Sequence, residues 1–251
     1  MPNNIVFLLT LLIGLLTTVL YFSIDQREQS HDIPVPDFSS YKDVVKKKKA
    51  FFAYLLPEIR KQNDLVLTER EQVIAMHERV LQGRELLGTE QGYLDELRLK
   101  YRIGEELSNK DASAGLIKRV DIIPAELILV QAANESGWGT SRFAQKGYNF
   151  FGLWCFTKDC GFVPKRRNKG TVHEVAKFRD LSQAVKSYLH NLNRHYAYEA
   201  LREIRYQQRR ANQPITAKAM VQGLKNYSER GTEYIDELLS MMRVNKKHMA
   251  L

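Results

Sequence analysis

The hydrophobic and polar positions divide the chain into four stretches of different character. Residues 5–24 form one uncharged apolar run, about as long as a helix that crosses a bilayer. A polar stretch at 25–39 follows, and its prolines Pro34 and Pro36 favour extended backbone. We therefore expect a signal anchor or signal peptide (1–24), a linker (25–39), a helical accessory region (40–115) and a C-terminal domain (116–251).

The accessory region shows apolar positions at helical spacing between many charged residues. One helix is predicted over 40–62, with a kink or break at Pro57. A second is predicted over 68–86, where Thr68 and Glu71 form a capping box. A third amphipathic helix is predicted over 91–107.

The C-terminal domain opens with a segment that is apolar around most of its circumference, which is typical of a buried helix. This segment covers 124–136, starts at Pro124 and ends at Gly137. Aromatic and β-favouring residues over 148–178 predict a short sheet. Further helices are predicted over 180–205, with Asp180 as cap, and over 214–223 and 231–243. The fold class is therefore mainly α with a small β-lobe.

The N-terminal run and the cysteines both indicate export. A retained anchor is favoured over a cleaved peptide because the run is long and no small-x-small cleavage site follows it. Cys155 and Cys160 lie close enough to form a disulfide in an oxidising compartment. A metal site would need more ligands than this pair and His173 offer, so neither metal nor cofactor is expected.

The net charge of +9 favours an anionic partner, such as phospholipid headgroups or a cell-wall polymer. Nucleic acid is disfavoured because of the export signal and because no nucleic-acid-binding motif appears.

Glu135 carries the clearest chemical signal. It lies on the last turn of the predicted buried helix, where burial and the negative end of the helix dipole both raise a carboxyl pKa. Nearby aromatic side chains supply an apolar wall: Trp138, Phe143, Phe150 and Phe151. A protonated carboxyl is the group that a glycosidase uses to protonate a leaving oxygen. The alternative is a structural Glu135 that caps the helix or pairs with Arg142.

Two motifs together resemble the glucosaminidase domain of glycoside hydrolase family 73. They are Glu135-Ser-Gly-Trp-Gly-Thr-Ser141 and Asn149-Phe-Phe-Gly-Leu153, and segments 177–179 and 226–236 are also similar. The resemblance covers 116–245. It implies a lysozyme-like catalytic domain that hydrolyses the β-1,4 bond after N-acetylglucosamine in peptidoglycan, with Glu135 as general acid and Tyr227 in the catalytic groove.

One departure from the family pattern concerns the second carboxylate. The zone where the resemblance implies it, residues 164–168, is basic in this chain. Glu174 is a candidate for the role if the hairpin is shorter. The acetamido group of the substrate is another, as in substrate-assisted glycosidases. A chain without hydrolytic activity is the third reading.

The residues expected to bind substrate come from the same motifs and their surroundings. Trp154 is the favoured platform for a sugar ring, whereas Trp138 either binds sugar or packs the floor of the site. Asn149 either binds substrate or caps a turn. The full set is Trp138, Asn149, Phe150, Phe151, Trp154 and Tyr227.

Two other functions remain open at this stage. A lytic transglycosylase also works with one acidic residue, and a non-catalytic, membrane-tethered glycan-binding protein would use the helices at 40–107 to hold partners. In each case we expect the C-terminal domain in the periplasm or cell envelope, anchored to the bacterial inner membrane or secreted.

Overall fold

The computed structural model describes residues 34–164, 173–225 and 227–251. Val35–Leu251 form one compact unit. Within the described ranges, no helix has both the length and the apolar composition that a bilayer crossing requires. The anchor predicted at 5–24 lies outside these ranges and stays a prediction.

The longest element is helix α2, Val44–Leu81, which starts where the Asp43 carboxylate accepts the first free backbone N–H groups. Of the kink or break predicted at Pro57, the break is wrong, and so is the predicted new start at Thr68. Thr68 instead donates its hydroxyl to the carbonyl of Asp64 one turn back, at 3.1 Å. The helix continues because buried side chains on both sides of Pro57 and beyond Thr68 outweigh one lost backbone hydrogen bond. These buried residues are Phe51, Phe52, Leu55, Leu56, Ile59, Val73 and Met76.

The second half of α2 packs with two further helices, α3 (Gly88–Tyr101) and α4 (Asn109–Arg119), around a separate small core. The predicted helix at 91–107 corresponds to α3 but ends earlier, because Arg102 adopts a left-handed conformation (φ 54°).

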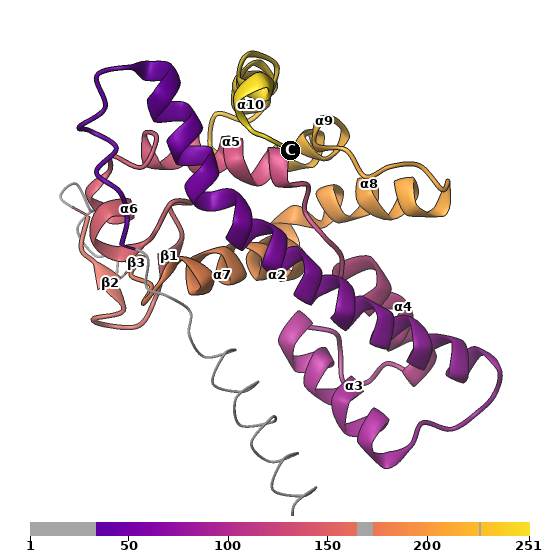
Figure 1. The fold of residues 1–251 in the computed structure, drawn as a ribbon. Coiled ribbons are helices and arrows are strands. Elements are labelled where there is room, and N and C mark those ends of the chain that lie inside the picture. Colours follow the sequence, from indigo (N-terminus) through magenta and orange to yellow (C-terminus); the bar gives the residue numbers. More distant parts are fainter. Residues whose placement is uncertain (1–33, 165–172, 226) are drawn as a thin grey trace, which may run out of the picture. The chain divides into compact units, whose positions relative to one another are not determined.

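Helix α5, Ala125–Ser136, is the predicted buried helix, and this prediction is confirmed. Its residues from Leu127 to Ala133 are almost fully shielded from solvent. Pro124 is the cap that precedes it, and Gly137 ends it in the left-handed region (φ 58°), which glycine adopts without strain. The helix lies between α2 and the C-terminal elements (Figure 1).

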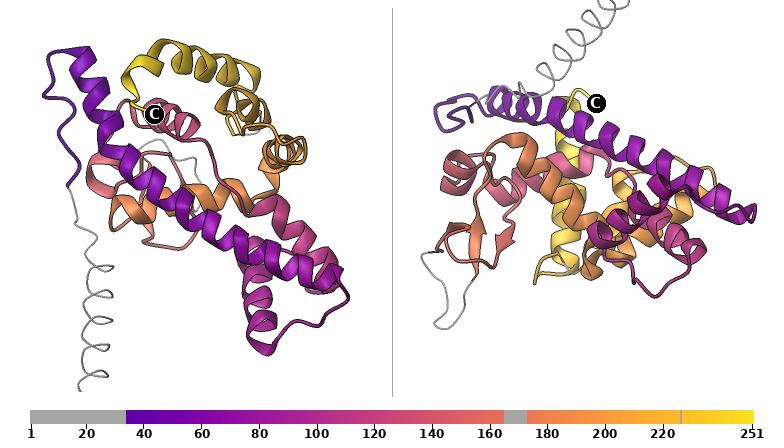
Figure 2. Two further views of the ribbon diagram at one scale, coloured as in Figure 1. Left: turned by 45° about the vertical axis from the view of Figure 1, so that its right-hand side comes forward. Right: turned by 90° about the horizontal axis from the view of Figure 1, so that it is seen from below.

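The β-lobe follows the short helix α6, Arg142–Gly147. Strands β1 (Trp154–Cys155), β2 (Gly161–Phe162) and β3 (Glu174–Ala176) form an antiparallel sheet in the order β1-β3-β2. The β-lobe lies near the N-terminal end of α2, whereas α3 and α4 lie near the C-terminal end of α2 (Figure 2).

The rest of the chain is helical. It comprises α7 (Leu181–Arg194), η1 (Tyr196–Tyr198), α8 (Glu199–Arg210), α9 (Ala217–Met220), η2 (Val221–Leu224), α10 (Thr232–Asn245) and η3 (Lys246–His248). Asp180 caps α7 as predicted. The single helix predicted over 180–205 is instead two, since His195 adopts extended backbone between them. The expected fold class, mainly helical with a small three-stranded sheet, is confirmed.

A buried ion cluster joins α2 to α8. The Asp121 carboxylate, 2% exposed, accepts from Arg209 at 2.8 and 3.0 Å and lies 3.5 Å from Arg70. Fully buried Arg205 donates to the carbonyls of Asp121 and Ile122. Residues on both sides of the predicted 115/116 boundary therefore share contacts, and the functional division at that boundary stays a prediction.

Candidate active site

Glu135 lies half-buried on the last turn of α5, next to two other elements. Its Oε1 accepts a hydrogen bond from the Tyr234 hydroxyl of α10 at 2.9 Å. Its Oε2 lies beside Gly152, where an added Cβ would be 3.7 Å away. Gly152 has a φ of 65°, which glycine adopts without strain, and it places no side chain against Oε2.

The pKa of Glu135 is raised above its ordinary value, chiefly because burial disfavours the charged carboxylate. The hydrogen bond from Tyr234 and the positive charge of Arg230 lower it, while the negative charge of Glu237 raises it. Arg230 and Glu237 also form an ion pair with each other, at 2.6 Å. The upward direction agrees with the sequence prediction.

A line of buried polar side chains leads to Glu135 from inside the protein. Tyr188 of α7 donates to Oε1 of Gln131, and Nε2 of Gln131 donates to Tyr234 Oη at 2.9 Å. Tyr234 in turn donates to Glu135. Burial raises the pKa of both tyrosines, so their hydroxyls stay protonated at neutral pH.

Tyr227 lies next to this line but not in it. Its hydroxyl donates to the carbonyl of Phe151 at 2.9 Å, and its ring stacks on Tyr234 at 5.5 Å between centroids. Tyr227 therefore packs against Tyr234, the residue that donates to Glu135. Its predicted catalytic role stays a prediction.

The Asn149-Phe-Phe block is buried. The Asn149 amide donates to the carbonyls of Leu153 and Ala176 and accepts from the Leu153 N–H at 3.0 Å. Phe150 and Phe151 are 0% and 2% exposed. This geometry favours a structural role over direct substrate binding for all three, because none presents a free surface.

The two tryptophans differ in exposure. Trp138 is half-buried, packs edge-on against Phe51 and Phe52 of α2, and carries Lys48 Nζ 4.9 Å above its ring. It also lines a cavity of about 460 Å³ together with Lys48, Asn134 and Glu237. Trp154 on β1 is 58% exposed and stacks on His173. Of the two, Trp154 has the exposed face that a sugar ring needs.

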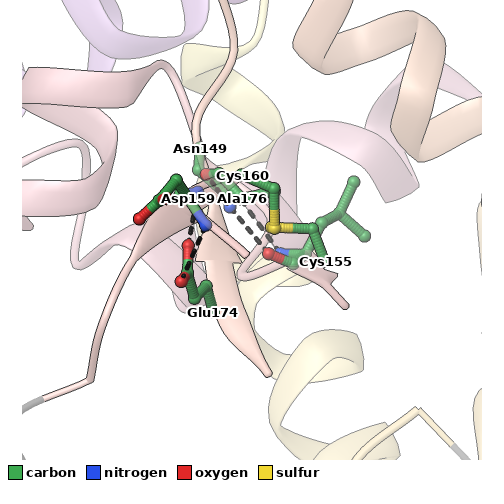
Figure 3. The surroundings of a disulfide bond; sticks show 8 residues. Asn149, Cys155, Asp159, Cys160, Glu174 and Ala176 are labelled. Carbon is green, nitrogen blue, oxygen red and sulfur yellow. Dashed lines mark hydrogen bonds between the residues drawn. A yellow bond between two sulfur atoms is a disulfide. The ribbon is translucent and has the colours of Figure 1, made fainter. Parts of the chain in front are cut away.

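Glu174 and the disulfide lie together in the β-lobe (Figure 3). Cys155 and Cys160 form the predicted disulfide. The buried Glu174 carboxylate accepts from the N–H groups of Asp159 at 3.2 Å and Gly161 at 2.8 Å. These contacts hold the loop between β1 and β2 in place, and the predicted catalytic role of Glu174 stays a prediction.

Among the described residues, three potential metal ligands cluster: Cys155, Cys160 and Glu174. The two sulfurs are bonded to each other, so neither is a thiolate that could bind a metal ion. Much of the basic stretch considered for a second carboxylate lies outside the described residues.

Sequence reasoning missed Gln131, Tyr188 and Tyr234. A signal existed for two of them: Gln131 precedes Glu135 by four residues, which places both on one helix face, and Tyr234 lies within the 226–236 motif. The sequence gives no comparable sign of Tyr188.

Comparisons with known proteins find a matching family and a similar protein. The glucosaminidase family, described as mannosyl-glycoprotein endo-beta-N-acetylglucosaminidase, matches residues 111–247. The chain is also similar to Protein bax of Escherichia coli (strain K12), at 33% identity over 225 residues, which cover 89% of this chain and 79% of that protein. No solved structure matches it significantly.

Proposed function

This chain belongs to the glucosaminidase family, a family of glycan-acting hydrolases, and we propose that it cleaves peptidoglycan at the β-1,4 bond after N-acetylglucosamine, with Glu135 as the general acid. One observation carries the proposal: a half-buried carboxyl with a raised pKa at the end of a buried helix, with the side-chain-free Gly152 beside its Oε2. Because its pKa is raised, this carboxyl keeps its proton to a higher pH than an ordinary glutamate does, and it can give that proton to the leaving oxygen.

The proposed substrate is a cell-wall glycan. The family description names a β-N-acetylglucosamine bond, and peptidoglycan contains such bonds outside the cytoplasm. The Cys155–Cys160 disulfide and the apolar run at 5–24 support a site of action in the envelope, because structural disulfides persist in oxidising compartments. The positive net charge suits a polymer whose stem peptides carry carboxylates. Trp154 is the proposed sugar platform.

The partner of the acid is proposed to come from the substrate. Both oxygens of Glu174 accept backbone N–H groups in the β-lobe, which favours a structural role for this carboxylate over catalysis. In a substrate-assisted reaction the acetamido oxygen attacks the anomeric carbon while Glu135 protonates the leaving oxygen. Water then opens the cyclic intermediate and returns a proton to Glu135.

Digestion of purified sacculi tests the function. The protein should release fragments with N-acetylglucosamine at the reducing end, and Glu135→Gln should reduce the rate by a factor on the order of 100 to 10,000. Glu126→Gln, at the other end of α5, is the matched control and should cut as the parent does. An unchanged rate in Glu135→Gln would contradict the assignment.

The products separate the alternative functions. Anhydro-muramic ends would identify a lytic transglycosylase, which also works with one acidic residue. Binding to insoluble peptidoglycan without released fragments would identify a glycan-binding protein.

The cellular location is a separate proposal. We propose that residues 5–24 anchor the chain in the inner membrane with residues 35–251 on the periplasmic side. In cell fractions, the full chain should sediment with membranes and be accessible to protease only after the outer membrane is opened. A soluble cytoplasmic chain would contradict this.

A further inference from the structure

We infer that the buried side chains of Tyr188, Gln131 and Tyr234 hold Glu135 so that its reactive proton is on Oε2, the oxygen beside Gly152. Gln131 and Tyr234 are then positioning residues. This inference rests on the proposed role of Glu135 as the acid. It goes further by assigning which oxygen delivers the proton and from which side the substrate must approach.

The direction of the hydrogen bonds carries the argument. Nε2 of Gln131 can only donate, so Tyr234 Oη accepts there and its own hydrogen is left for Glu135 Oε1. At the far end Tyr188 donates to Oε1 of Gln131. Gln131 is fully buried, and its two amide atoms face different tyrosines, Oε1 toward Tyr188 and Nε2 toward Tyr234.

The consequence is an asymmetric carboxyl group. Oε1 receives a hydrogen bond, so a proton on Oε1 would compete with the hydrogen of Tyr234 for the same space. The acidic proton therefore belongs on Oε2. Oε2 lies beside Gly152, which has no side chain to cover it. The leaving oxygen of the glycan then approaches from the Gly152 side.

If the hydrogen bonds between Gln131, Tyr234 and Glu135 ran in the opposite direction, the pKa of Glu135 would change with the opposite sign in Tyr234→Phe. If the amide of Gln131 were turned over, Tyr234 would donate to Gln131, and the Glu135 acid would donate its proton to Tyr234. That arrangement stabilises the protonated acid and turns its proton away from the substrate. Removing the Tyr234 hydroxyl then lowers the pKa of Glu135, whereas in the proposed arrangement it raises the pKa, because a donor to the carboxylate is lost.

The test is a carbon-13 NMR titration of the glutamate carboxyl groups in the full chain, with Glu135 assigned from its absence in Glu135→Gln. Tyr234→Phe should raise the pKa of Glu135 by about half to one pH unit, because hydrogen bonds to charged groups are stronger than those to neutral ones. Gln131→Met should raise it by less, since Tyr234 keeps its hydroxyl but loses the amide that orients it.

Tyr101→Phe is the matched control. Tyr101 is also buried and its hydroxyl also donates to a carboxylate, that of Glu69, but in the core formed by α3 and α4. This variant should leave the Glu135 titration unchanged, and near-ultraviolet circular dichroism reports whether each variant keeps its packing. If Tyr234→Phe does not fold, the sign of the shift in Gln131→Met decides.

A downward shift, or none, in the folded variants overturns the inference. The titration needs no substrate, so its result stands even if the protein cuts no glycan, and the two proposals fail separately. If the protein is active, the basic limb of kcat/KM should move upward with the NMR pKa in Tyr234→Phe.

Discussion

The ion cluster at Asp121 offers a quantitative test of how α2 is held to α8. In Asp121→Asn the side chain keeps its shape but loses the charge that faces Arg70 and Arg209. Removing one partner of a buried ion pair costs about 3 to 5 kcal/mol, because the other charge stays buried without compensation. We expect the lower end, about 3 kcal/mol, because Arg209 is 38% exposed and water can solvate it.

The assay is urea unfolding of residues 35–251, monitored by circular dichroism. Asp64→Asn, at an exposed position of α2, is the control. The free energy of unfolding should fall by about 3 kcal/mol, and the midpoint of thermal unfolding by about 6 to 12 °C for a unit of this size. A loss below about 1 kcal/mol, the range of surface ion pairs, would refute the reasoning.

The pH dependence of this difference has a definite sign. Hydrogen bonds from Arg209 and the nearby guanidinium charges hold the pKa of Asp121 below its ordinary value, although burial acts the other way. Its contribution to stability is therefore complete above about pH 4, the pKa of an unfolded aspartate. It is lost as pH falls through the lower pKa of the folded state. The stability gap between the parent and Asp121→Asn should thus close only in acid.

Three further changes should have separable effects. Trp154→Ala should raise KM for soluble glycan fragments by about tenfold with an unchanged melting temperature, since the ring is exposed; an equal KM would remove it from the binding surface. Asn149→Ala should lower the unfolding free energy by about 2 to 3 kcal/mol in urea titrations, because buried backbone groups lose their partners, and a loss near zero would show that water replaces the amide. The double change Cys155→Ser and Cys160→Ser should lower the free energy of unfolding by about 2 kcal/mol, because the unfolded chain gains conformational freedom. Dithiothreitol should destabilise the parent by the same amount. A destabilising effect of dithiothreitol on the double variant would point to another cause.

The local signals in the sequence were reliable where neighbouring residues alone decide the backbone. Gly137 ends α5 in a left-handed conformation, and Asp180 caps α7, because each effect depends on one residue and the next turn of chain. The disulfide belongs to the same class, since its cysteines are separated by only 5 positions.

The local signals failed where packing competes with them. Pro57 and Thr68 are signs of a helix break and a helix start, yet α2 runs through both. Side chains on both sides of Pro57 are buried in the main core, and those beyond Thr68 are buried in the smaller core with α3 and α4. That burial outweighs one missing hydrogen bond and one unfavourable propensity.

For the candidate site, the sequence by itself determined which carboxyl is the candidate acid and which helix carries it. Periodicity made α5 a buried helix, Gly137 ended it, and Glu135 therefore fell on its last, partly shielded turn. Only the tertiary structure decided the state of that acid. The donor to its Oε1 lies 99 residues away in Tyr234, and the glycine beside its Oε2 is brought there by the fold of the loop at Gly152. A pKa is set by everything packed around a carboxyl group, and no local pattern contains that information.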